Sequence, residues 1–63
     1  MEIHEFDVVR LKDGREVVIM EIFNGGEAYY VEFPGPPGGD CELFEITPSE
    51  IVEVTYRSSY REG

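Results

Sequence analysis

The chain has 63 residues, and its 14 Asp and Glu against five Lys and Arg give a net charge of −9 at pH 7. This length suits one small domain, and the hydrophobic share of 41% exceeds that of a disordered acidic tail. The charge argues against direct nucleic-acid binding, because affinity for phosphates comes from Lys and Arg, and it favours encounter with a basic partner.

Neither a membrane segment nor a metal site is expected from the sequence. No apolar run approaches the about 18 residues that span a bilayer, and the opening MEIHEFD is acidic where a signal peptide is basic. We therefore expect a cytoplasmic protein without membrane contact. Cys41 is the single cysteine and His4 the single histidine, so we expect no internal disulfide, no zinc site and no cofactor.

Gly, Pro and Asp residues divide the chain into short segments typical of an all-β domain. Asp13-Gly14 favours a tight turn after the first segment, and Asn24-Gly25-Gly26 turns the chain after the second. Residues 34–40, PGPPGGD, cannot continue a strand ladder and are expected to form a loop. The sequence therefore predicts strands over residues 6–11, 15–23, 27–33, 41–46 and 51–56.

A single turn of 3-10 helix is predicted just before the last strand. Thr47 suits the N-cap, Pro48 the first helical position, and Glu50 completes the pattern of a capping box. The segment is too short for an α-helix, so 3-10 geometry is expected. Residues 57–63 are polar, and we expect them to fray as a C-terminal tail.

The alternation of apolar and polar residues predicts the register of the hairpin formed by the second and third strands. With Gly25-Gly26 as a two-residue primed turn, one face becomes apolar, because a shift by one residue would mix apolar and polar positions. The cross-strand pairs on that face would be Ile22 with Tyr29, Met20 with Val31, and Val18 with Phe33. Tyr29, Phe33 and Phe44 are accordingly assigned to the core.

The opposite, outer face of this hairpin combines apolar and acidic side chains. Glu21 would pair with Tyr30 there, beside Phe23 and Glu32, and Val17 and Ile19 would share the face. The alternative is that the long second strand bends and buries Val17 and Ile19. An apolar patch rimmed by acids is typical of a protein-binding surface, so we predict that Glu21, Phe23, Tyr30 and Glu32 contact the partner.

Three segments carry a resemblance to a known family. They are Asp7–Leu11 (DVVRL) before an Asp-Gly turn, Glu27–Phe33 (EAYYVEF), and Ile46–Ile51 (ITPSEI) before the closing strand. Together they resemble a family of short, mostly bacterial domains of unknown function with an SH3-like fold. The resemblance implies a five-stranded SH3-like barrel over residues 1–56. Some members of that family lie near toxin or immunity genes, which implies an inhibitor, antitoxin or immunity-type protein.

Enzymatic chemistry finds little support in the sequence. Cys41 and His4 are the one candidate nucleophile and base, and no third group is evident to orient them. The carboxylates are abundant, but acid–base catalysis needs a pair in a pocket with separated pKa values, and the interior of a small barrel is filled by side chains. We therefore predict no catalytic residues and no enzyme.

The sequence thus predicts an acidic protein-binding module whose partner is another protein with a basic surface. One alternative is an SH3-type groove for Pro-rich peptides, built from Tyr30, Tyr56 and the acids near Glu21 and Glu32. A nucleic-acid-associated barrel is a weaker alternative, because the basic groove is missing. Weak association of the chain with itself is left open.

Overall fold

The computed structural model describes residues 2–35 and 38–57 of the chain. Within these ranges the fold is all-β, as predicted, and each strand begins and ends within two residues of its predicted bounds. The elements are β1 (Val8–Leu11), β2 (Glu16–Phe23), β3 (Ala28–Phe33), β4 (Glu42–Ile46), the 3-10 turn η1 (Pro48–Glu50) and β5 (Ile51–Tyr56).

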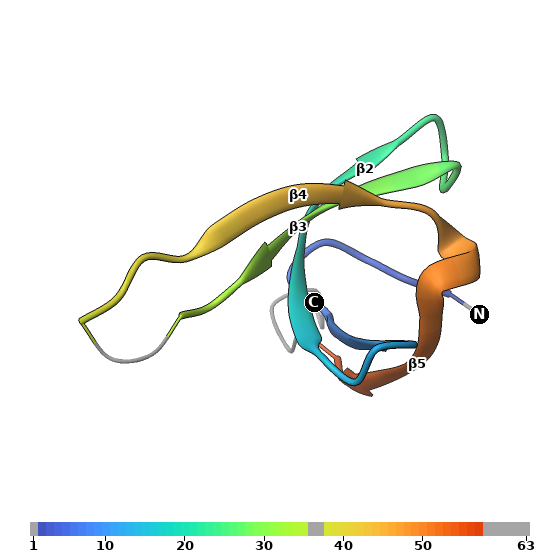
Figure 1. Ribbon diagram of the computed structural model, residues 1–63. Helices are drawn as coiled ribbons and strands as arrows, with labels where there is room; N and C mark the ends of the chain where they lie inside the picture. Colours follow the sequence, from blue (N-terminus) through green and yellow to red (C-terminus); the bar gives the residue numbers. More distant parts are fainter. Residues whose placement is uncertain (1, 36–37, 58–63) are drawn as a thin grey trace.

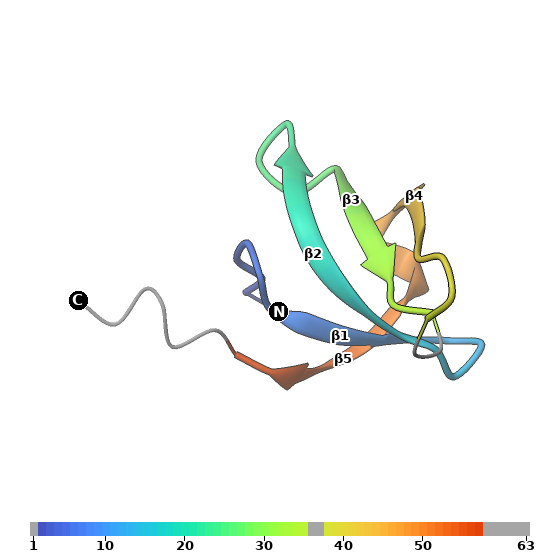
Figure 2. The same cartoon turned by 90° about the vertical axis from the view of Figure 1, so that its left-hand side faces the viewer.

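All five strands pair antiparallel in one sheet, in the order β4-β3-β2-β1-β5. The sheet curls around a common interior, with β4 and β5 joined by η1 (Figure 1). Turned by 90°, β1 is seen between β5 and β2, with β3 beyond them (Figure 2). The paired strands do not close into a ring, so β4 and β5 are the two edges of an open sheet.

The core lies on the concave side of the sheet. Tyr29 is buried there as predicted, whereas Phe33 and Phe44 are only half-buried and pack against the core from one side. Burial of apolar surface on this side is the main stabilising contribution to so small a fold. The buried apolar residues are Val9, Leu11, Val17, Ile19, Tyr29, Val31, Ile46 and Ile51.

The β2–β3 register agrees with the prediction only near the turn. Ile22 pairs with Tyr29 and Glu21 with Tyr30, but the register then shifts by one residue at Met20. Beyond the shift, Ile19 pairs with Val31. The predicted pairing of Met20 with Val31 is therefore wrong, because a β-bulge places an extra residue on β2.

The bulge reverses which side chains of β2 face the core. Val17 and Ile19 are fully buried, whereas Val18 is half-buried and pairs with Glu32, not with Phe33. The assignment of Val17 and Ile19 to the outer face is thus wrong, and the alternative that β2 bends and buries them is confirmed. A bulge has this effect because side chains alternate along a strand, so one extra residue exchanges the two faces.

The turn between β2 and β3 is longer than the predicted two residues. The ladder ends at the pair Phe23–Ala28, which leaves a loop of four residues. The N–H groups of Gly26 and Glu27 both donate to the Phe23 carbonyl, each at 3.0 Å. Asn24 and Gly25 have φ values of 51° and 71°, the left-handed region that Asn and Gly tolerate best.

The 3-10 turn before β5 lacks the predicted cap. At η1, Thr47 is the N-cap, but its hydroxyl bonds to that of Ser49 at 3.0 Å, so the predicted capping box does not form. The predicted fraying of residues 57–63 lies outside the described residues, apart from Arg57.

Within the described ranges, no helix has the length and apolar character needed to cross a membrane.

Candidate protein-binding face

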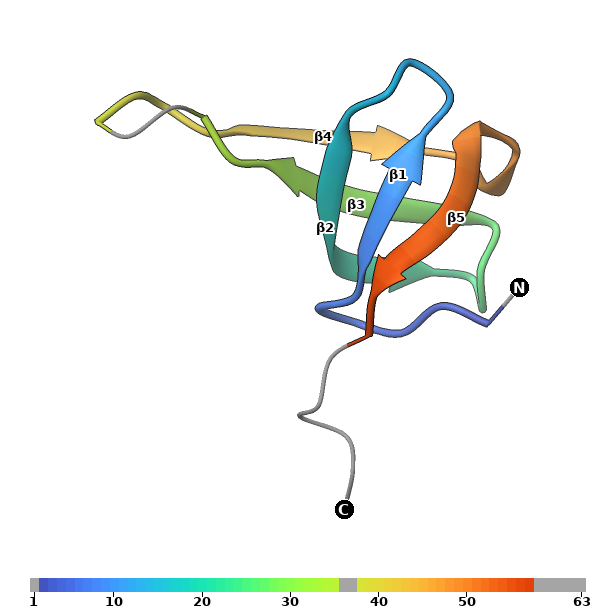
Figure 3. The same ribbon diagram turned by 90° about the horizontal axis from the view of Figure 1, so that it is seen from below.

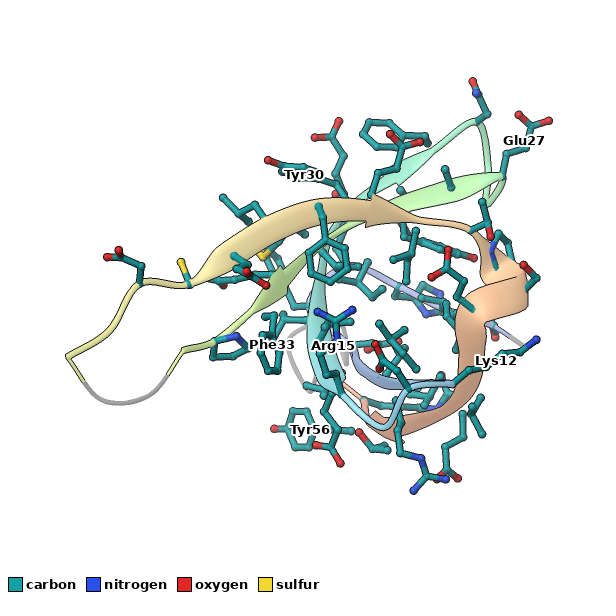
Figure 4. All side chains as sticks on the ribbon, in the orientation of Figure 1. Lys12, Arg15, Glu27, Tyr30, Phe33 and Tyr56 are labelled. Carbon is teal, nitrogen blue, oxygen red and sulfur yellow. The ribbon has the colours of Figure 1, made fainter. Side chains whose placement is uncertain are left out.

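Tyr30 is the centre of the outer, convex face of the sheet. Tyr29 and Val31 are buried, so Tyr30 between them points away from the core, as Figure 4 shows. The ladder places Glu21 of β2 on one side of Tyr30 and Glu45 of β4 on the other. Adjacent strands lie about 4.8 Å apart, so the two carboxylates flank the phenol ring in one row across the sheet.

A second row follows next to the first. Val18 of β2, Glu32 of β3 and Leu43 of β4 are paired in register, and Leu43 is 50% exposed. Phe23 pairs with Ala28 at the turn end of the same face and is half-buried. We refer to these residues as the acidic face: Val18, Glu21, Phe23, Tyr30, Glu32, Leu43 and Glu45.

The structure brings all four predicted contact residues, Glu21, Phe23, Tyr30 and Glu32, onto this face. Sequence reasoning missed three further members. Leu43 and Glu45 come from β4, whose register with β3 is not set by a short turn, and the predicted register without a bulge places Val18 on the apolar face. Period-two alternation in CELFEI is the signal that could have found Leu43 and Glu45.

The described basic residues lie elsewhere on the molecule. Arg10 forms an ion pair with Glu53, and Arg57 Nη1 lies 3.8 Å from the Asp7 carboxylate. Lys12 and Arg15 belong to the region of the β1–β2 turn, away from Tyr30 (Figure 4). Within residues 2–35 and 38–57, no Lys or Arg pairs with the three glutamates of the acidic face, which therefore keeps its negative charge.

Arg15 has a structural position on the opposite side of the sheet. Its guanidinium carbon lies 5.4 Å from the ring centre of Phe33 and 4.9 Å from that of Phe44, within cation–π range. Its Nε donates to Asp13 at 2.8 Å. The Arg15 backbone N–H, followed by this side chain, lowers the pKa of the Asp13 carboxyl. The contacts connect the β1–β2 turn to β3 and β4.

Cys41 and His4 occupy different parts of the structure. Cys41 is exposed just before β4, where the neighbouring Glu32 carboxylate raises the pKa of its thiol by accepting its hydrogen bond and by charge. This disfavours the thiolate, which is the reactive form. His4 lies in the segment before β1, where its Nε2 is 3.4 Å from the Glu2 carboxylate.

No group of three or more His, Cys, Asp or Glu in the described part of the chain is arranged to hold a metal ion. In comparisons with known proteins, no family model, curated protein or solved structure matched the chain.

Proposed function

We propose that this chain is a non-enzymatic protein-binding module whose acidic face holds a basic surface of another protein. The observation that carries the proposal is the row Glu21–Tyr30–Glu45, an aromatic ring between two carboxylates that have no basic partner among the described residues. Such a row suits a lysine or arginine side chain, whose apolar stem packs on the ring while its charged head lies between the carboxylates.

The remaining residues of the face supply the apolar part of the contact. Leu43 is half exposed, and Phe23 extends the surface toward the turn. The net charge of −9 would accelerate encounter with a basic protein, and the apolar residues would slow its dissociation. This division of roles is typical of small acidic inhibitors that cover a basic site, which supports the inhibitor, antitoxin or immunity-type function implied by the resemblance.

We further propose that the fold is a variant of the SH3-like barrel. The strand order and the 3-10 turn between the last two strands support this assignment. The peptide-binding function of SH3 domains is less well supported, because β1 and β2 lie between Tyr56 on β5 and Tyr30 on β3. These two rings are therefore not neighbours in one groove.

The proposal is tested by capture of partners from a lysate of the source organism with two charge-matched variants. Glu21→Lys/Glu32→Lys reverses two charges on the acidic face, and Glu27→Lys/Glu50→Lys reverses two exposed charges elsewhere. Each pair changes the net charge by four units, from −9 to −5. We expect a basic protein to be retained by the native chain and the second variant, and binding to the first to be weaker by about tenfold or more.

The purified complex should also weaken between about 50 and about 500 mM salt without vanishing, because salt screens the charges but not the apolar contact. Equal loss in both variants would show that only the overall charge matters and would overturn the assignment of the face. Binding insensitive to salt would overturn the electrostatic part of the proposal.

A further inference from the structure

The two edges of the open sheet differ in regularity. β5 pairs with β1 through two register shifts, one between Val8 and Val9 and one between Arg10 and Leu11. β4 pairs with β3 over five consecutive residues, Glu42–Ile46, without any shift. Bulges protect an edge because they interrupt the row of backbone groups that a further strand would need. By this criterion the β5 edge is protected and the β4 edge is not.

β4 is also accessible along its length. Ile46 is its one buried residue, and Glu42, Leu43 and Glu45 are exposed. Seen from below, the hairpin of β3 and β4 extends beyond the rest of the sheet (Figure 3). The outer edge of β4 is therefore accessible to an added strand.

The charge on this edge identifies the kind of strand that it can accept. β4 carries Glu42 and Glu45 and no basic residue, and Asp40 precedes it in the exposed loop. Glu42 forms a long ion pair with an Arg15 nitrogen at 3.9 Å, and Glu45 has no ion pair within the described residues. A second copy of the chain, itself with a net charge of −9, would be repelled, whereas a basic strand would be attracted.

We propose that the free edge of β4 accepts an extended, basic segment of the partner protein as an additional antiparallel or parallel strand. This proposal rests on the proposed function and deepens it. Alternate side chains of the added strand would lie beside Leu43 and Glu45, continuing the acidic face, and the others beside Glu42 and Phe44. Backbone hydrogen bonds would supply affinity, and Glu42 and Glu45, which lie on opposite faces of β4, would each favour a Lys or Arg on their own face of the added strand.

The test uses the full chain and a short synthetic peptide that alternates Lys and Val. The matched control has the same sequence with every backbone nitrogen methylated, which keeps charge and side chains but removes all N–H donors for strand pairing. We expect the unmethylated peptide to slow amide hydrogen exchange in Glu42–Ile46 and not in Ile51–Tyr56. Methylation should weaken binding by about tenfold or more, because several backbone hydrogen bonds are lost together.

A variant on the protein side separates the edge from the acidic face. Glu42 lies on β4 but outside that face, so Glu42→Lys should weaken peptide binding several-fold, while Glu27→Lys in the β2–β3 turn should not. Binding that is unaffected by methylation, or that protects β5, would overturn the edge proposal and leave the acidic face standing. Failure of both peptides would likewise overturn it, and the proposed function would fail too only if no basic partner were captured through Glu21 and Glu32.

Discussion

At the scale of single residues, Asp7 has the most demanding environment in the described structure, because it is a carboxyl with no exposed surface. Its Oδ2 accepts a hydrogen bond from the His4 backbone N–H at 3.0 Å, and its own carbonyl accepts one from the Ile19 N–H at 2.9 Å. Arg57 lies 3.8 Å from the same carboxylate. Asp7 thus connects the segment before β1 with β2 and with the end of β5.

Replacing this carboxyl should destabilise the fold. We expect Asp7→Ala to lower the free energy of unfolding by about 1–3 kcal/mol, because the partly buried His4 N–H loses its acceptor. Asp7→Asn should be milder, since an amide oxygen can still accept that bond. The measurement is urea unfolding, with the exposed neighbour Glu5→Ala as control, expected to stay within about 0.5 kcal/mol of the native chain. Equal effects at the two sites would contradict this role of Asp7.

The reactivity of the Cys41 thiol gives a second test at the scale of single residues, because it depends on the neighbouring Glu32 carboxylate. Glu32 raises the pKa of the Cys41 thiol, so at pH 8 a smaller share of the native thiol is ionised than in a variant without that carboxylate. Glu32→Gln should therefore be alkylated faster by iodoacetamide at pH 8, with the midpoint of its pH–rate curve displaced to lower pH.

The sign of this effect follows from the protonation state. Above both midpoints the thiol is fully ionised in each protein, so the two rates should converge at high pH. Glu27→Gln, an exposed acid in the β2–β3 turn, serves as the control and should match the native curve. A slower reaction of Glu32→Gln at pH 8 would contradict the position of the Glu32 carboxylate beside the thiol.

At the scale of elements, Arg15 connects the β1–β2 turn to the β3–β4 hairpin through Phe33 and Phe44. Arg15→Lys keeps the charge but loses the planar guanidinium that lies near both rings and donates to Asp13. We expect a loss of about 1 kcal/mol in unfolding free energy, measured by chemical denaturation. Arg10→Lys is the matched control, because the exposed pair of Arg10 with Glu53 contributes little. A larger loss at Arg10 would contradict this assignment.

The strands themselves could be predicted from the sequence because their signals are local. Turn residues such as Asp13-Gly14 and the loop after Phe33 fix where strands end, and β-branched runs fix where they lie. The bulge at Met20 carries no such signal. It follows from the need to curl β2 so that Val17 and Ile19 reach the core, and this depends on contacts with β1 and with the residues before it.

The candidate face could also be predicted only in part from the sequence. Glu21, Phe23, Tyr30 and Glu32 lie within one hairpin, so turn and alternation were enough to place them together near the turn. Leu43 and Glu45 required the pairing of β3 with β4, which lie on either side of residues 34–40, and no local pattern determines that pairing. The residues whose place on the face could not be predicted are therefore those that depend on long-range strand pairing.

At the scale of the whole molecule, the charge of −9 on 63 residues acts against the compact state. Folding brings the carboxylates of the acidic face together without basic neighbours among the described residues, so screening should relieve their repulsion. We expect the melting temperature of the native chain to rise by several degrees between about 10 and about 500 mM NaCl. The measurement is thermal unfolding followed by circular dichroism.

The charge-reversed pairs make this prediction specific to the face. Both Glu21→Lys/Glu32→Lys and Glu27→Lys/Glu50→Lys carry a net charge of −5, but the first removes repulsion within the acidic face, so its melting temperature should depend least on salt. Salt would then stabilise the free protein and weaken its complex with a basic partner, because the same glutamates repel one another in the first case and attract the partner in the second. A melting temperature that falls with salt would show that favourable ion pairs such as Arg10–Glu53 outweigh the repulsion among the glutamates of the acidic face. A basic partner would then gain no affinity by relieving that repulsion.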